Sequence, residues 1–293
     1  MPEESENKNT AASIVAPHAT PIPPWAIAPF EDFLGHMERL GKFLDLVRNS
    51  LIVIDEMQKR VRSSLQESGI QPDAAGEKLI DHTEKLAAEA RGEIQSGFSM
   101  LHSQAAILLW SGLETLVKDY VVRSLMERPG LILEEPWSSL KVKIGDYEGA
   151  DQEQKARFLV DEQSARTRTR GGIARFELMV EWVGLKGSVG SDHRAAIYEL
   201  QQVRNVFAHN RGVADSMFCD ACKHLGLQPG QPLTVSQVMF DKYSNASTSY
   251  VFELMLRSSE FFGGTIAREA LFNAAQKLKL KVTDTTTAAR QSD

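Results

Sequence analysis

The chain has 293 residues, 42% hydrophobic and 25% charged, which is the composition of an ordinary globular protein with a core of one large domain or two smaller ones. Its formal net charge of −6 gives no general attraction to nucleic acid, so any contact with RNA or DNA has to be local. No apolar run approaches the roughly twenty residues of a membrane span and no N-terminal segment resembles a signal peptide, so we expect a cytoplasmic protein without membrane contact.

The first 75 residues divide into a lead-in and a long helix. Residues 1–28 are rich in proline, small and polar residues, which predicts a mostly disordered segment. Residues 29–75 are expected to form a helical arm, because apolar residues recur at spacings of four and three with only Gln58 interrupting them. The pattern suits a coiled-coil seam and an intramolecular bundle helix equally. Its members are Phe33, Met37, Leu40, Leu44, Val47, Leu51, Ile54, Val61 and Leu65.

Residues 76–281 are predicted to form a helical bundle, which makes the whole chain all-α. A helix over 77–127 is expected to bend near Gly92 to Gly97 and to be strongly apolar from Phe98 to Leu125. Within its apolar half, Glu114 and Lys118 are spaced for a pair on one face. Further segments complete the bundle: a loop over 131–149, helices over 151–170, 173–183, 213–225 and 247–280, an extended segment or short strand over 233–240, and a flexible tail over 282–293.

Three closely spaced arginines make the densest positive patch in the chain. Arg166, Arg168 and Arg170 alternate with threonines and no aromatic residue lies between them, so the patch is not a base-stacking platform. A solvated loop and a weak RNA-phosphate contact both fit. The glycine-rich connection over 184–191 lacks the Gly-Lys-Ser/Thr of a phosphate-binding loop.

The two cysteines are too few for a disulfide framework. Cys219 and Cys222 form one Cys-x-x-Cys pair, and His224 adds a third ligand at most. A structural zinc site needs four, so we expect neither a metal nor another cofactor.

The richest group of polar side chains lies at the end of a helix predicted to start with Asp192 as its cap and to end at Gly212. Leu200, Val203 and Phe207 have helical spacing and form its buried stripe. Cations are common at helix ends because they favour the C-terminal end of the helix dipole, so the group also has a purely structural interpretation. The polar residues beside the stripe are Arg204, Asn205, His209, Asn210 and Arg211.

Arg204 and His209 are five residues apart, which is about 140° of rotation on a regular helix. They converge only if the helix ends between or just after them, if the arginine curls back, or if a second chain brings its own copy. A twofold dimer brings identical segments together. The spacing therefore favours a composite site at a dimer interface.

These residue types suit cleavage of RNA through its own 2′-hydroxyl group. Histidine can move a proton at neutral pH, and arginine can hold the non-bridging oxygens and the charge that grows on them. The asparagines could orient the phosphate or the imidazole. This chemistry requires no metal.

The segment Arg204-Asn-Val-Phe-Ala-His209, with its lead-in from Leu200 and its extension to Gly212, resembles the signature of the HEPN superfamily. Many members also carry a Glu-x-x-x-Lys pattern on an earlier helix, and Glu114-Thr-Leu-Val-Lys118-Asp119 is similar to it. The resemblance covers roughly residues 98–218 and does not extend to the arm.

This resemblance implies a helical bundle of the HEPN type that dimerises and cleaves RNA without a metal, in a bacterial defence or toxin–antitoxin system. Arg204, Asn205 and His209 would be catalytic, and an antitoxin or regulatory protein is an expected partner. Two alternatives stay open: a non-catalytic module that dimerises or binds a partner, and a nucleotide-binding module. The supporting residues would be Glu114, Lys118, Asp119, Asn210 and Arg211.

Overall fold

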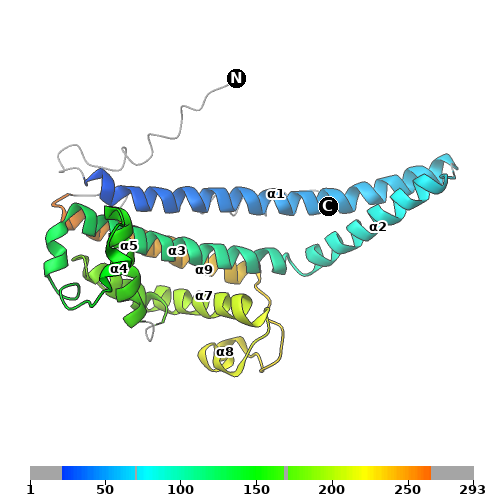
Figure 1. Ribbon diagram of the computed structural model, residues 1–293. Coiled ribbons are helices and arrows are strands. Elements are labelled where there is room, and N and C mark those ends of the chain that lie inside the picture. The colour runs from blue at the N-terminus through cyan, green and yellow to red at the C-terminus, as the bar shows by residue number, and fades with distance from the viewer. Residues whose placement is uncertain (1–21, 70, 168–170, 265–293) are drawn as a thin grey trace, which may run out of the picture.

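The computed structural model describes residues 22–69, 71–167 and 171–264, and this part of the chain is all-α, as the sequence predicts (Figure 1). No β-strand forms within it, and one isolated bridge joins Val213 to Pro232. Short 3₁₀ turns occupy Pro129–Leu133 and Lys223–Leu225. The α-helices are α1 (Pro24–Ser68), α2 (Ala74–Gln95), α3 (Ser99–Glu127), α4 (Ile144–Tyr147), α5 (Gln152–Arg166), α6 (Ile173–Glu181), α7 (Ser191–Asn210), α8 (Ser216–Ala221) and α9 (Gln237–Phe261).

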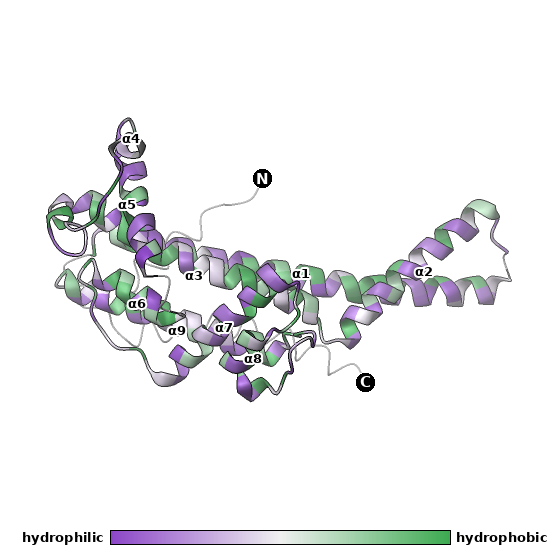
Figure 2. Cartoon of the chain, turned by 60° about the horizontal axis from the view of Figure 1, so that its bottom comes forward, coloured by the Kyte–Doolittle hydropathy of each residue, from purple (hydrophilic) through white to green (hydrophobic). Residues whose placement is uncertain are grey.

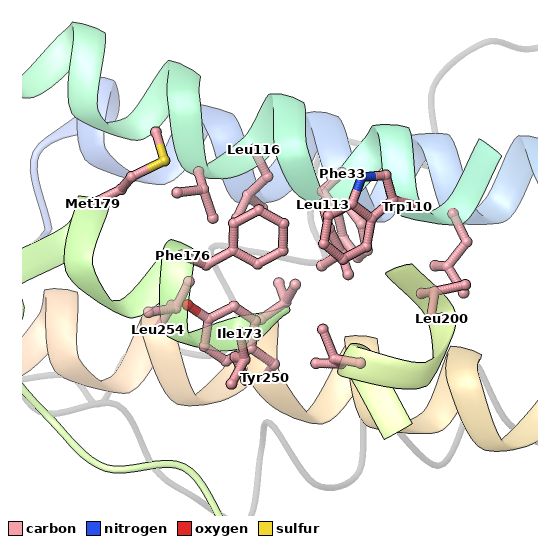
Figure 3. Packing of buried hydrophobic residues seen from close by; sticks show 14 of the residues in the cluster. Phe33, Trp110, Leu113, Leu116, Ile173, Phe176, Met179, Leu200, Tyr250 and Leu254 are labelled. Atoms are coloured by element: carbon pink, nitrogen blue, oxygen red, sulfur yellow. The ribbon is translucent and has the colours of Figure 1, made fainter. Parts of the chain in front are cut away.

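Helix α3 is the centre of the bundle, because its apolar residues cover most of its circumference and neighbours pack on several sides of it. α1, α5, α6, α7 and α9 all contact it. Figure 3 shows its Trp110 beside Phe176 of α6, whose ring lies in turn beside Tyr250 of α9. The ring centroids are 5.0 Å apart in the first pair and 6.4 Å in the second. These stacked rings join α3, α6 and α9 into one core.

Helix α1 begins at Pro24, so the prediction of disorder through residue 28 is wrong for its last residues. Proline fits the first position of a helix because its missing N–H has no helical partner there. Ala26 and Phe30 are buried, and the Phe30 ring lies 5.5 Å from that of Tyr120 on α3. The start of α1 is therefore part of the bundle core. Residues 1–21 lie outside the described part.

The second half of α1 runs beyond the bundle and pairs with α2 as a projecting arm (Figures 1 and 2). The predicted apolar stripe is buried only at its beginning, by Phe33, Leu40 and Leu44. Farther out the inward positions are polar, and Asp55 lies between Lys59 at 2.5 Å and Arg91 of α2 at 3.4 Å. The expectation of one continuous apolar seam is thus wrong for the arm. Two of its members, Ile54 and Val61, are exposed.

The predicted bend near residues 92–97 is a complete break between α2 and α3. Gly97 and Phe98 both have left-handed backbones, with φ of 69° and 60°. The Glu93 carboxylate accepts a hydrogen bond from the Leu101 amide at 3.0 Å and so caps the start of α3. Arg48 of α1 lies over the Phe98 ring, 5.3 Å from its centroid. These contacts fix the joint at the base of the arm.

Helix ends in the second half of the chain differ from the predictions in several places. Asp192 is inside α7, whose N-cap is Gly190, and the left-handed C-cap is Arg211 with φ of 55°, followed by Gly212. The expected extended segment is short, because Ser236 caps α9 and starts it ten residues earlier than predicted. The predicted end of this helix and the tail over 282–293 fall mostly or wholly outside the described residues.

Gly172, just before α6, has a φ of 59°, and a Cβ there would lie 2.9 Å from the Tyr198 Cα of α7. We expect Gly172→Ala to lower the free energy of unfolding by about 2–3 kcal/mol, because a left-handed backbone is strained with a side chain and the backbone of α7 cannot yield cheaply. Chemical denaturation followed by circular dichroism measures this.

The matched control is Gly92→Ala in α2, where nothing lies within 4 Å of an added Cβ. That change is expected to be neutral or to stabilise by up to about 1 kcal/mol, since alanine favours a helix over glycine. Equal effects at both positions would contradict the close packing of α7 against residue 172.

Candidate functional site

The candidate site lies on the last three turns of α7. Ala196, Leu200, Val203 and Val206 are buried against the bundle, and Phe207 is partly buried, so the predicted apolar stripe is confirmed with Val206 added to it. This anchoring fixes the rotation of the helix about its axis. The solvent-facing surface of this short segment carries Arg204, Asn205, His209 and Asn210.

Arg204 and Asn205 are brought together. The Arg204 guanidinium donates a hydrogen bond to the Asn205 Oδ1 at 3.2 Å, and both side chains are partly exposed. The amide therefore orients the guanidinium while part of its hydrogen-bonding capacity stays open to solvent. A guanidinium held in this way can donate hydrogen bonds to two oxygens of a phosphate.

His209 is exposed and lies in the last turn of the same regular helix, which ends only after Asn210. Helical rotation places it about 140° around the axis from Arg204. Within the described residues no hydrogen bond joins the two side chains. One chain therefore does not assemble the arginine–histidine pair in this structure.

Asn210 and Arg211 form the C-terminal end of α7. The Asn210 amide donates to the Asp215 carboxylate at 2.6 Å, and the other oxygen of Asp215 caps α8 by accepting the Phe218 amide at 2.7 Å. These two hydrogen bonds lower the pKa of Asp215, with the Phe218 amide contributing more. Arg211 is exposed at the left-handed turn that follows. The Asn210–Asp215 hydrogen bond thus ties the end of α7 to the start of α8.

The supporting residues of α3 pair with other helices. Glu114 and Lys118 do not bond to each other, because Glu114 pairs with Arg175 of α6 at 3.4 Å and Lys118 with Asp161 of α5 at 3.2 Å. The spacing on α3 therefore predicted a pair between Glu114 and Lys118 that does not form. Each residue pairs with a neighbouring helix instead.

Asp119 completes this set by pairing with Arg157 of α5 at 2.8 Å. In the described part of the chain, no ion pair or hydrogen bond joins the three α3 residues to Arg204 or His209. Their contacts fix α5 and α6 against α3. Among the arginines of the loop, Arg166 is exposed at the end of α5, and Arg168 and Arg170 lie outside the described residues.

A second polar cluster, which the sequence pattern did not predict, surrounds Glu199 on the buried face of α7. Its Oε1 accepts hydrogen bonds from Lys242 Nζ and Tyr243 Oη, and its Oε2 bonds to His224 Nε2, all at 2.6 Å. The residue is only 4% exposed. The signal in the sequence was a carboxylate in register with Ala196, Leu200 and Val203, at a position where helical spacing predicts an apolar residue.

The charge state of this cluster follows from its contacts. Burial alone would raise the pKa of Glu199, but the hydrogen bonds from Lys242 and Tyr243 outweigh it, and the net pKa is lowered. Burial, followed by the charge of Glu199, raises the pKa of the nearby Cys222 thiol to about 11. Cys222 is therefore a neutral thiol at physiological pH, a poor nucleophile and a poor metal ligand.

Two clefts open along the first half of α7. One of about 530 Å³ is lined by Gly171, Ile173, Arg194 and Tyr198, among others, and one of about 410 Å³ by Tyr198 and the Glu199 cluster. Neither cleft includes Arg204, Asn205 or His209. The arginine–histidine segment is thus an exposed surface near the end of a helix, beyond both hollows.

Over the described ranges, no three His, Cys, Asp or Glu side chains form a group that could hold a metal ion. No helix in those ranges has the length and apolarity needed to cross a membrane. Comparisons with protein-family models, with curated proteins and with solved structures gave no match.

Proposed function

We propose that the chain is a metal-independent endoribonuclease of the HEPN type whose active site is completed by a second copy of the chain. The observation that carries the proposal is that the Arg204–Asn205 pair is partly exposed and His209 exposed, on a helix whose other face is anchored in the core. Residues without a structural role in their own chain are available to a ligand or a partner.

The proposed reaction uses the 2′-hydroxyl of the substrate as nucleophile. Its oxygen attacks the adjacent phosphorus, the bond from phosphorus to the 5′-oxygen breaks, and a 2′,3′-cyclic phosphate and a 5′-hydroxyl result. His209 transfers a proton, taking it from the attacking hydroxyl or delivering it to the leaving oxygen. Arg204 holds the non-bridging oxygens as charge grows on them, and Asn205 keeps the guanidinium in position.

A composite site follows from the helix geometry. Because α7 is regular through His209, the two side chains of one chain point in different directions. A twofold axis near the end of α7 would bring Arg204 of each chain toward His209 of the other. The biological setting that goes with this activity is bacterial defence or toxin–antitoxin regulation in the cytoplasm, with RNA as substrate and an inhibitor protein as partner.

The proposal is tested with purified wild-type protein, mixed RNA and an excess of chelator. Cleavage is expected to persist, and the fragments are expected to carry 2′,3′-cyclic phosphate and 5′-hydroxyl ends. Intact RNA, or fragments with 3′-hydroxyl and 5′-phosphate ends, would overturn the proposed chemistry.

The second candidate function is a non-catalytic interaction module. It is favoured by one observation, the large exposed apolar side chains along the arm, which have no role in RNA cleavage. Under this alternative the arm binds a partner and the polar end of α7 contributes to an interface. Failure of cleavage by a folded, self-associating protein would favour it.

A further inference from the structure

The longest helix carries two apolar faces, and the bundle and α2 cover only one of them. The covered face includes Phe33, Leu40 and Leu44. The other face, called here the α1 stripe, is between 36% and 66% exposed at each of its large side chains. Its members are Phe43, Leu46, Val53, Ile54, Met57 and Val61.

The α1 stripe has the spacing of a coiled-coil seam. On a regular helix its members and Ser50 fall within about 60° of a common direction, roughly a third of a turn away from the covered face. It extends over 19 residues from Phe43 to Val61, a rise of about 27 Å along the helix axis. The hydropathy colouring of Figure 2 shows apolar residues alternating with polar ones along the arm. Such a row on one face indicates a helix that packs against another helix.

We infer that the α1 stripe is a self-association surface that packs antiparallel against the same stripe of a second copy, with the twofold axis at Ser50. In this register Phe43 faces Met57 and Leu46 faces Ile54, so large side chains meet large ones of the partner. Ser50 faces its own copy. Its short side chain, which bonds to the Leu46 carbonyl at 2.8 Å, lets the two helices approach closely at the crossing point.

Charge complementarity favours the antiparallel arrangement and a second copy as the occupant. Lys42 and Glu56 flank the same side of the stripe and are equally distant from Asn49, next to the proposed axis. In an antiparallel pair each Lys42 lies beside a Glu56 of the other chain, twice by symmetry. In a parallel pair this flank of one helix would lie beside the opposite flank of the other, so the contact between Lys42 and Glu56 would not form.

The area is sufficient for an interface of modest strength. Six large apolar side chains near half exposure offer on the order of 500 Å² per chain, which is a large patch for a monomer. Two stripes together bury on the order of 1,000 Å², near the lower limit for a specific protein–protein interface. The association is therefore expected to depend on protein concentration.

The α1 stripe is separate from the proposed catalytic pairing. α1 and α7 pack on different sides of α3 (Figure 1), so pairing through α1 does not bring two α7 ends together. The inference therefore does not depend on the proposed function. Its test uses mass and cross-linking without RNA, so the two can fail independently.

The first test is sedimentation velocity of the full chain with Leu46→Glu and with Val53→Glu. Each change places a charge in the seam and is expected to weaken association by at least about 100-fold, which halves the mass of the particle at micromolar concentration. Leu79→Glu is the matched control, because Leu79 is 64% exposed on α2 and lies outside the stripe. Unchanged mass in both stripe variants with native helicity would overturn the inference, as would an equal loss of mass in the control.

Cross-linking fixes the orientation. In a Cys219→Ser background, Ser50→Cys is expected to form a covalent dimer with a short thiol cross-linker, because the two copies meet at the axis. Phe43→Cys is expected to cross-link to Met57→Cys in a mixture of the two variants and not to itself. A self-linked Phe43→Cys would overturn the antiparallel arrangement, and an unlinked Ser50→Cys would overturn the stripe pairing.

Discussion

Replacing His209 by alanine is expected to slow RNA cleavage by about 100-fold to 10,000-fold, because the proposed reaction loses its proton-transfer group. Replacing Arg204 by alanine is expected to slow it by about 100-fold to 1,000-fold, because charge on the phosphate oxygens loses its main stabilising contact. Both residues have exposed or partly exposed side chains outside the core, so the variants should fold. Initial cleavage rates of a labelled RNA measure both effects.

A mixture of the two inactive variants tests whether two chains share the site. If Arg204 of one chain acts with His209 of the other, each mixed dimer contains one intact site and one site that lacks both residues. Random exchange of equal amounts then restores about a quarter of the wild-type rate. If both residues act within one chain, mixing restores nothing.

Two controls separate chemistry from general damage. His193→Ala removes an exposed histidine from the first turn of the same helix, and Arg62→Ala removes an exposed arginine that pairs with Glu84 on the arm. Both are expected to retain cleavage within about twofold, since solvated side chains and surface ion pairs contribute little. Equal losses in controls and site variants would contradict the roles given to Arg204 and His209.

Replacing Glu199 is expected to give the largest loss of stability in the bundle. Glu199→Leu leaves the buried Tyr243 hydroxyl and the Lys242 ammonium without their acceptor, which we expect to cost about 2–4 kcal/mol of unfolding free energy. The value lies at the lower end for buried ion pairs because Lys242 and His224 both reach water. Glu199→Gln, which keeps one acceptor oxygen, is expected to cost about half as much. Equilibrium denaturation at neutral pH measures both.

The pH dependence has a defined sign. The folded-state pKa of Glu199 is lowered, so its ionised form contributes stability above the ordinary carboxyl range and loses that contribution as pH falls through the folded value. The difference between wild type and Glu199→Gln should therefore be constant near neutrality and shrink below about pH 4. A difference that grows in acid would contradict the ion-pair assignment.

Asp192→Asn is the matched control for this pair of variants. Asp192 lines the same cleft but is exposed in the first turn of α7. Its replacement is expected to change stability by less than about 0.5 kcal/mol. A loss as large as that of Glu199→Leu would show that any charge change in the cleft destabilises the fold, whatever its burial.

The segment from Leu200 to Gly212 shows which features follow from the local sequence. Leu200 and Val203 are buried because their spacing matches the helical repeat, and the same repeat places Arg204 and His209 on different faces. The break before α3 was likewise signalled by Gly92 and Gly97. These features depend on residues within a few positions of each other.

Contacts between distant segments could not be derived in this way. Glu199 accepts a hydrogen bond from Tyr243, which lies 44 positions away in the sequence. Glu114 pairs with Arg175 and not with Lys118, although Lys118 lies one turn along the same helix. The helix propensities of these residues do not distinguish between such partners. The partners are determined by the way α6 and α9 pack against α3.

The long helix shows both levels at once. The sequence alone predicts a continuous helix, because apolar residues recur along α1 at spacings of four and three. Which of its faces is covered was decided only by the tertiary structure, because the bundle and α2 pack on the side of Leu40, Leu44 and Asp55 and leave Leu46 and Val53 in solvent. A helix specifies its own periodicity, whereas its neighbours select the face that is buried.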